Sequence, residues 1–232
     1  MDELAVYIGW DSREVEAFDV CEHTLKKHWQ SDPKLLRIEA LKQHELRSKG
    51  MYHRDVDKLA ATEFSLTRFL VPSLNQFRGY AVFVDCDFVF LDDIKAVFDE
   101  IDPNKAISVV KHDYAPQEKY KMDGAIQHNY PRKNWSSFMV FNCAHPSNRK
   151  LTDLTVNHES PAFLHRLSWL KDSEIGEIGR RWNYLEGHYP ADEVDIKAIH
   201  FTRGGPWFKN MQHVDFADVW LNEYSEIKRK IA

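Results

Sequence analysis

Two aspartates directly after an apolar segment are the strongest chemical signal in the 232-residue sequence. Asp85 and Asp87 flank Cys86 and follow the apolar segment Tyr80–Val84, which suits a central β-strand. Two neighbouring buried carboxylates repel each other, and one takes up a proton unless a cation lies between them. Mg²⁺ and Mn²⁺ favour oxygen ligands, and open α/β sheets bind ligands at the carboxyl ends of their strands. We therefore expect a divalent-cation site, although the two aspartates could instead begin a turn.

A histidine near the C-terminus could complete this site. His200 ends an apolar segment, and Arg203, Gly204 and Trp207 follow it. Imidazole is a good third ligand for Mn²⁺. The glycine allows close approach of a bulky anion, the guanidinium could offset phosphate charge, and the indole could stack on a base or a sugar ring. A core histidine before an ordinary Gly-Gly turn, with a solvated arginine, explains the same residues.

The segments around these residues predict an α/β fold. Apolar segments predict strands at residues 4–9, 34–39, 80–84, 106–111, 138–141 and 196–201. Spacing and capping residues predict helices at 13–29, within 64–74 and at 216–231, with Pro72 ending or bending the second helix. The polar residues 111–134 are typical of a surface excursion. The first strand, helix and strand form a βαβ unit, which requires a parallel sheet.

The composition limits the class of partner and the compartment. Lys and Arg total 31 against 36 for Asp and Glu, a net charge of −5 with no basic block, which argues against nucleic-acid binding. The widely spaced Cys21, Cys86 and Cys143 argue against a disulfide scaffold or a structural zinc site and favour a cytoplasmic location. No apolar segment approaches the roughly 18 residues of a membrane span, so we expect no transmembrane segment.

Several motifs together resemble those of the GT-A fold nucleotide-sugar glycosyltransferases. The Asp-Cys-Asp motif and the His-x-x-x-Gly-Gly-Pro-Trp motif that begins at His200 carry the resemblance, which is strongest to family 8, the glycogenin-like and lipopolysaccharide galactosyltransferase-like enzymes. Residues 63–69, 135–142 and 181–184 resemble further segments of that family. The motifs occur in the family's order and cover nearly the whole chain.

The resemblance implies one GT-A (Rossmann-like) domain over residues 1–232, with a mostly parallel central sheet flanked by helices. Its nucleotide-binding half would span 1–110 and its acceptor-binding, metal-completing half 111–232. Asp85, Asp87 and His200 would hold Mn²⁺ or Mg²⁺ across the diphosphate of a nucleoside-diphosphate sugar, with a UDP-sugar as the expected donor. The residues along the nucleotide and donor would be Tyr7, Ile8, Gly9, Asp11, Arg68 and Ser137, with Cys86 beside them. Trp182 and Asn183 would lie on the acceptor or sugar side.

Three departures from the family pattern leave the retaining or inverting outcome open. Residues 171–177 lack the family's middle Gln, Ser136-Ser137 replaces a small-Gly pair, and no Lys precedes Pro206. An inverting enzyme needs a carboxylate base near the acceptor hydroxyl. The candidates are Asp172, Glu174 and Glu177, each of which could equally be a solvated surface acid.

The leading hypothesis is a metal-dependent glycosyltransferase that moves a hexosyl or deoxyhexosyl group to a hydroxyl of a glycan or another acceptor. An aspartyl phosphatase also carries Asp-x-Asp at a strand end. That motif usually lies near the N-terminus and continues into Gly-Thr, whereas Phe88 and Val89 follow here. A catalytically silent nucleotide-sugar-binding module is the third hypothesis, because a fold does not fix an activity.

Overall fold

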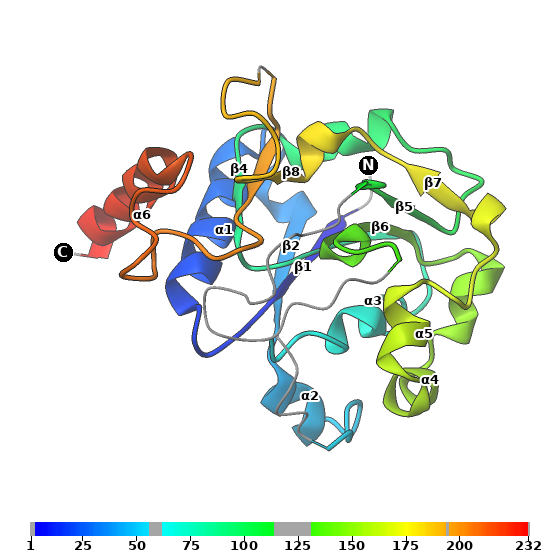
Figure 1. Ribbon diagram of the computed structural model, residues 1–232. Helices are drawn as coiled ribbons and strands as arrows, with labels where there is room; N and C mark the ends of the chain where they lie inside the picture. Colours follow the sequence, from blue (N-terminus) through cyan, green and yellow to red (C-terminus); the bar gives the residue numbers. More distant parts are fainter. Residues whose placement is uncertain (1–2, 56–61, 114–130, 194, 232) are drawn as a thin grey trace.

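A six-stranded sheet is the centre of the computed structural model, which describes residues 3–55, 62–113, 131–193 and 195–231 (Figure 1). Most of the expected excursion at 111–134 lies outside these residues. Within them, the strand order of this sheet is β2-β1-β3-β6-β5-β7. The strands are β1 (Leu4–Gly9), β2 (Leu36–Leu41), β3 (Tyr80–Val84), β5 (Ile107–Val109), β6 (Phe138–Asn142) and β7 (Ile175–Glu177).

The sheet is mostly parallel, as the sequence predicts. Strand β1 pairs in parallel with β2 and β3, and β5 pairs in parallel with β7. Only β6, among the described strands of this sheet, runs against its neighbours β3 and β5. The carboxyl ends of β1 and β3 therefore lie at the same edge, and Asp85 follows directly after β3 at that edge.

A small second sheet lies next to this edge. Within the described residues it consists of β4 (Phe88–Phe90), β9 (Ala198–His200) and β8 (Tyr184–Leu185), in the order β4-β9-β8. Strand β9 is a shorter form of the strand predicted at 196–201. The sequence does not predict β4 or β8, because two or three residues are too few to show a periodicity.

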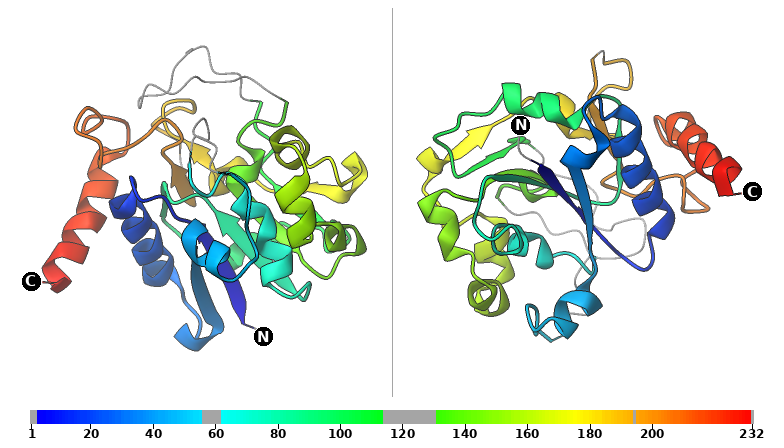
Figure 2. Two further views of the ribbon diagram at one scale, coloured as in Figure 1. Left: turned by 90° about the horizontal axis from the view of Figure 1, so that it is seen from below. Right: turned by 180° about the vertical axis from the view of Figure 1, so that it is seen from behind.

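Two long helices pack side by side at one side of the molecule. Helix α1 (Val15–His28) and helix α6 (Ala217–Ile231) confirm the two long predicted helices within two residues at each end. Figures 1 and 2 show α6 against α1, on the side away from α4 (Asp153–His158) and α5 (Pro161–His165). Val20 of α1 is fully buried in an apolar cluster with residues of β9 and α6.

The predicted helix within 64–74 is divided in two. The 3-10 helix η2 (Thr67–Leu70) is followed by α3 (Val71–Leu74), and Pro72 lies in the first turn of α3 instead of at its end. Proline suits that position because the first N–H groups of a helix have no helical acceptor. The remaining helices are α2 (Gln43–Ser48), η1 (Pro33–Leu35), η3 (Ile94–Asp99), η4 (Trp135–Ser137), η5 (Pro146–Lys150), η6 (Asp172–Glu174) and η7 (Arg180–Trp182).

No helix in the described part of the chain is both long enough and apolar enough to span a bilayer. The three cysteines are free and buried.

Candidate functional site

Strand pairing brings Asp85, Asp87 and His200 together. The Asp85 N–H donates to the Ser137 carbonyl (2.9 Å), which continues the pairing of β3 with β6. Strand β4 pairs with β9 so that Phe88 lies opposite His200, and the Phe201 N–H donates to the Asp87 carbonyl (3.0 Å). One carboxylate oxygen from each aspartate and one ring nitrogen of His200 consequently lie within 4.8 Å of one another.

The donor set of this cluster suits a divalent cation. The His200 side chain is 1% exposed, and its ring stacks on Phe88 with centroids 4.4 Å apart and planes 16° apart. Its Nε2 lies 3.3 Å from Oδ1 of Asp87. Within the described residues, this buried Oδ1 accepts no hydrogen bond. A buried carboxylate oxygen without a donor is costly, and a metal ion held with two carboxylates and an imidazole removes that cost.

Arg68 of η2 places a permanent positive charge beside the cluster. Its Nη1 lies 2.7 Å from Oδ1 of Asp85 and donates to the Ser136 carbonyl at 2.7 Å. The guanidinium also lies over the rings of Phe64 and Phe83, at 5.2 and 4.9 Å. The guanidinium of Arg68 therefore balances the charge of Asp85, and a bound cation would balance the charge of Asp87.

A cleft of about 140 Å³ opens over the cluster. The predicted metal, nucleotide and donor residues in its wall are Arg68, Asp85, Asp87, Ser137, His200, Arg203 and Gly204. These seven come from η2, the turn between β3 and β4, η4, β9 and the loop after β9, so chain segments far apart in sequence meet at one edge of the sheet.

Arg203 is held in the cleft wall by a buried glutamate. Its Nη2 lies 3.2 and 3.3 Å from the two carboxylate oxygens of Glu186, whose residue is 1% exposed. Burial raises the pKa of Glu186, and the Arg203 charge opposes that shift. Gly187 has φ +65°, and a Cβ there would lie 1.6 Å from Nη2 of Arg203. Glycine at position 187 is thus what lets the guanidinium lie where it does.

Glu14, Asn134 and His165 are among the cleft residues that were not predicted from the sequence. Glu14 precedes α1; burial and the charges of Asp87 and Asp11 raise the pKa of Glu14 to about 8. The amide Nδ2 of Asn134 is buried and has no hydrogen-bond partner in the described residues. His165 lies 3.0 Å from the Ser136 hydroxyl, and burial lowers its pKa to about 3, so its ring is neutral. Of these three residues, only Glu14 has a sequence position that suggests a role in the site. It comes soon after the carboxyl end of β1, and Asp85 comes directly after the carboxyl end of β3.

The predicted nucleotide residues of the first strand do not line the described cleft. Tyr7 and Ile8 are fully buried inside β1. A Cβ at Gly9 would lie 2.4 Å from the ring of Phe64, which lines the cleft.

Asp11 is fully buried and does not line the described cleft either. It accepts hydrogen bonds from the Arg13 guanidinium (2.8 and 2.9 Å) and the Glu63 N–H (3.0 Å). Burial raises the pKa of Asp11, but the bonds from Arg13 and Glu63 outweigh burial and hold it below the usual value. It thereby ties the segment after β1 to the segment that leads to Phe64.

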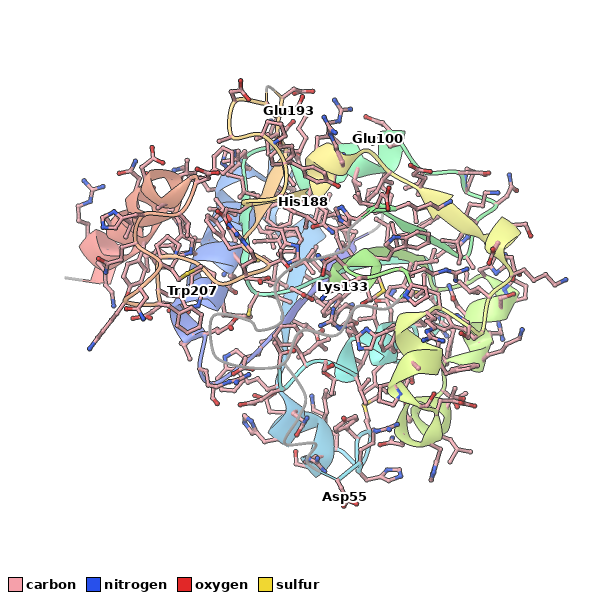
Figure 3. All side chains as sticks on the ribbon, in the orientation of Figure 1. Asp55, Glu100, Lys133, His188, Glu193 and Trp207 are labelled. Atoms are coloured by element: carbon pink, nitrogen blue, oxygen red, sulfur yellow. The ribbon has the colours of Figure 1, made fainter. Side chains whose placement is uncertain are left out.

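Three more of the predicted contacts, Trp182, Asn183 and Cys86, are covered by protein. Trp182 is 1% exposed, and its Nε1 donates to Oε1 of Glu100 (2.9 Å; Glu100 is labelled in Figure 3). A ring so buried offers no face to a sugar. Asn183 is fully buried and bonds to His200 instead.

Cys86 is the third covered residue, and Trp207 is only partly buried. Cys86 is buried, with its thiol donating to Oε2 of Glu14 (3.4 Å). Trp207 packs on Phe201, Phe208 and Trp220 on the side of α6 (Figure 3).

The three candidate bases lie outside the described cleft. The Asp172 side chain is 89% exposed and pairs with Arg132 (2.6 Å). Glu174 accepts from the Ser147 hydroxyl (2.5 Å), and this bond holds its pKa below the usual value. The Glu177 side chain is 66% exposed, 3.9 Å from the ammonium of Lys111.

A second cluster of possible metal ligands and a second hollow in the described residues are weaker candidates for a metal site. His23, Glu223 and Glu226 also bring three possible ligand atoms together, but the Lys27 ammonium lies 2.8 Å from Glu223 and 3.0 Å from Glu226 and takes the cation's place. A hollow of about 880 Å³ lies at the opposite edge of the sheet, where Leu4 and Tyr80 begin their strands. None of its lining residues belongs to a group of possible metal ligands among the described residues.

Solved structures of glycosyltransferases share the fold of this chain. The bifunctional glycosyltransferase WbbM superposes with a TM-score of 0.65 at 14% identity, over 96% of this chain and 50% of WbbM. GlyE of Streptococcus pneumoniae TIGR4 gives 0.61 at 13% identity, over 97% of this chain and 60% of GlyE. The galactosyltransferase LgtC, solved in complex with donor and acceptor sugar analogs, gives 0.59 at 10% identity, over 96% of this chain and 95% of LgtC.

These likenesses confirm the GT-A-like α/β fold, and this chain spans only about half of WbbM and three fifths of GlyE. No family model matches the chain. A curated protein of Arabidopsis thaliana, Protein CDI, is 49% identical over 229 residues, which are 97% of this chain and 87% of that protein. The chain therefore belongs to the same protein family as Protein CDI.

Proposed function

We propose that this protein is a metal-dependent glycosyltransferase of the family 8 type. It transfers a hexosyl or deoxyhexosyl group from a nucleoside-diphosphate sugar, a UDP-sugar, to a hydroxyl group of a glycan or another acceptor. The observation that carries the proposal is the convergence of Asp85, Asp87 and His200 at the carboxyl edge of the sheet. The glycosyltransferases that share the fold support sugar transfer as the reaction.

The site has what this reaction needs at the leaving group. Glycosyl transfer develops positive charge on the sugar ring and negative charge on the departing diphosphate. When bound, Mn²⁺ or Mg²⁺ supplies Lewis-acid stabilisation of that diphosphate. Asp85, Asp87 and His200 are the residues that would hold the ion, and their mixture of carboxylate and imidazole suits Mn²⁺.

Other cleft residues would bind and orient the donor. Arg203 places a guanidinium in the cleft wall, where it would pair with phosphate oxygens. Gly204, with φ +108°, has no side chain to hold the diphosphate away from the backbone. The unpartnered Nδ2 of Asn134 would donate to a phosphate or sugar oxygen. A cytoplasmic location remains a prediction that rests on the pattern of free cysteines.

Metal-dependent release of UDP from UDP-hexoses is the test of this function. We expect the wild-type protein to release UDP with Mn²⁺ and not with a chelator. Asp87→Ala should lower the rate by about 100-fold or more, because the leaving group loses its counter-charge. The matched control is Asp192→Ala, an exposed acid outside the cleft, which should retain the wild-type rate. Binding of UDP-hexoses without any release of UDP would contradict the proposal and indicate a binding module. Phosphate release from a generic phosphoester would indicate a phosphatase.

A further inference from the structure

A chain of buried hydrogen bonds ends at His200. The Ser137 hydroxyl donates to the Asn134 carbonyl at 2.7 Å, and Nδ2 of Asn183 donates to the Ser137 hydroxyl at 2.8 Å. Oδ1 of Asn183 lies 2.8 Å from Nδ1 of His200. Ser137, Asn183 and His200 are 3%, 0% and 1% exposed, so solvent does not compete for these bonds.

The direction of each proton follows from the first bond. A carbonyl oxygen only accepts, so the single proton of the Ser137 hydroxyl is used on Asn134. The hydroxyl oxygen must then accept from Asn183, which turns the amide NH₂ toward Ser137 and Oδ1 toward His200. Because Oδ1 also only accepts, the ring proton of His200 must be on Nδ1.

The consequence falls on the other ring nitrogen. A neutral imidazole with its proton on Nδ1 has a lone pair at Nε2, the atom that lies 3.3 Å from Oδ1 of Asp87. Stacking on Phe88 fixes the plane of the ring. In this tautomer two acceptor atoms face each other, an arrangement that suits a cation placed between them.

We propose that Asn183 and Ser137 are positioning residues that hold His200 in the Nδ1-protonated form, so that Nε2 is already a metal ligand before the ion arrives. The inference rests on the cation site of the proposed function but does not depend on sugar transfer. Partners that orient a metal-bound histidine typically change metal affinity by about 10–100-fold. Neither residue touches the ion in this account.

The direct test is the tautomer of His200 in the metal-free protein, read by NMR of ¹⁵N-labelled histidine with His200→Gln as the assignment control. At a pH at which the ring is neutral, we expect the wild-type protein to show the pattern of a proton on Nδ1 and none on Nε2. Asn183→Leu and Ser137→Ala should lose that pattern, whereas Asn183→Asp keeps an acceptor for Nδ1 and should retain it. Ser136→Ala is the matched control, because the neighbouring hydroxyl bonds to His165 instead.

The second readout is the affinity for Mn²⁺ alone, measured by electron paramagnetic resonance. Asn183→Leu and Ser137→Ala should weaken it by about 10–100-fold. Asn148→Ala removes another fully buried amide, one that bonds to backbone carbonyls away from the cleft, and should lower stability without changing Mn²⁺ affinity. If Asn183→Leu does not fold, the tautomer and the Mn²⁺ affinity of Ser137→Ala alone test the proposal.

A neutral His200 ring with its proton on Nε2 in the wild-type protein, or unchanged Mn²⁺ affinity in folded Asn183→Leu or Ser137→Ala, would overturn the inference. Both readouts are independent of sugar transfer. An absence of UDP release would therefore contradict the proposed function and leave this inference standing.

Discussion

Nε2 of His200 lies 3.3 Å from Oδ1 of Asp87, although 200 − 87 = 113 positions separate the two residues in the sequence. The pairing of β4 with β9 creates this contact, since Phe88 lies opposite His200 and Asp87 directly precedes Phe88. The cation site therefore exists only when the small sheet is formed. Its geometry is set by the pairing of these two strands.

Arg68→Ala should destabilise the metal-free protein and make it depend on a cation. The ion pair with Asp85 is buried, with side chains 7% and 15% exposed. Removing one partner of such a pair typically costs about 3–5 kcal/mol, because the other charge is left uncompensated. Mn²⁺ should return part of this loss, so its addition should raise the melting temperature more in Arg68→Ala than in the wild-type protein.

Arg180→Ala is the matched control for that experiment. Arg180 pairs with Glu193 at the surface (Glu193 is labelled in Figure 3), with side chains 54% and 31% exposed. Exposed pairs contribute at most about 1 kcal/mol, so this variant should melt close to the wild-type protein with and without Mn²⁺. Equal effects of Mn²⁺ on the two variants and the wild-type protein would argue against a cation beside Asp85.

The ionisation of Glu14 should lower stability as the pH rises. Burial, Asp87 and Asp11 raise its pKa to about 8 in the folded protein from 4.5. The unfolded chain therefore loses this proton first, and the stabilisation present below about pH 4.5 is lost as the pH rises through about 8. Glu14→Gln cannot ionise and should escape this loss.

Calorimetry of the chelated protein checks the effect. Between pH 5 and pH 9, the stability of Glu14→Gln relative to the wild-type protein should rise by on the order of 4 kcal/mol, or about 8–16 °C in melting temperature. Mn²⁺ should narrow the gap, because a nearby cation favours the ionised carboxylate. Parallel stability curves for the two proteins would show that Glu14 ionises normally.

Gly187→Ala should act on nucleotide binding through Arg203. The added Cβ would overlap the guanidinium of Arg203, and the residue has φ +65°. We expect the affinity for UDP to fall about tenfold, the effect of losing one charge-assisted hydrogen bond. Arg203→Ala should lose as much affinity for UDP, and the double variant Gly187→Ala/Arg203→Ala should lose no more than either single variant.

A second glycine separates this effect from backbone strain. Gly50 has φ +72° and open space around its missing side chain, so Gly50→Ala carries similar strain without touching the cleft. It should bind UDP like the wild-type protein. If both glycine variants lose the same affinity, the loss reflects strain and not Arg203.

Asp172→Asn, Glu174→Gln and Glu177→Gln should each retain kcat and KM within about twofold, because none of the three acids lies in the described cleft. The measurement is steady-state release of UDP from a UDP-hexose. A fall of about tenfold or more in kcat at unchanged KM for any one of them would instead support that acid as the acceptor-side base.

The local features of the site could be predicted from the sequence. Strand β3 has the predicted bounds because its five apolar residues are followed by polar ones, and this ending places Asp85 and Asp87 at the sheet edge. His200 was predicted from residue type and from the glycines after it. Each of these inferences depends on a few neighbouring residues and on the rule that ligands bind at carboxyl edges.

The contacts between distant segments could not be predicted in the same way. The register that sets His200 beside Asp87 belongs to strands of three residues, which are too short to show a pattern. Trp182 and Asn183 have side chains typical of sugar contacts, but their burial depends on the packing of η7 under Glu100 and on the hydrogen bond to His200. Their position in the tertiary structure, not their type, decides what they do.

Calorimetric titration of UDP in the presence of Mn²⁺ tests the central claim most directly, with the wild-type protein, Asp87→Asn and the exposed control Asp192→Asn. We expect the wild-type protein and Asp192→Asn to bind UDP, and a chelator to abolish this binding. Asp87→Asn should bind UDP at least about tenfold more weakly, a difference of about 1.4 kcal/mol. Equal affinity of Asp87→Asn and the wild-type protein, or binding that is indifferent to Mn²⁺, would contradict the central claim.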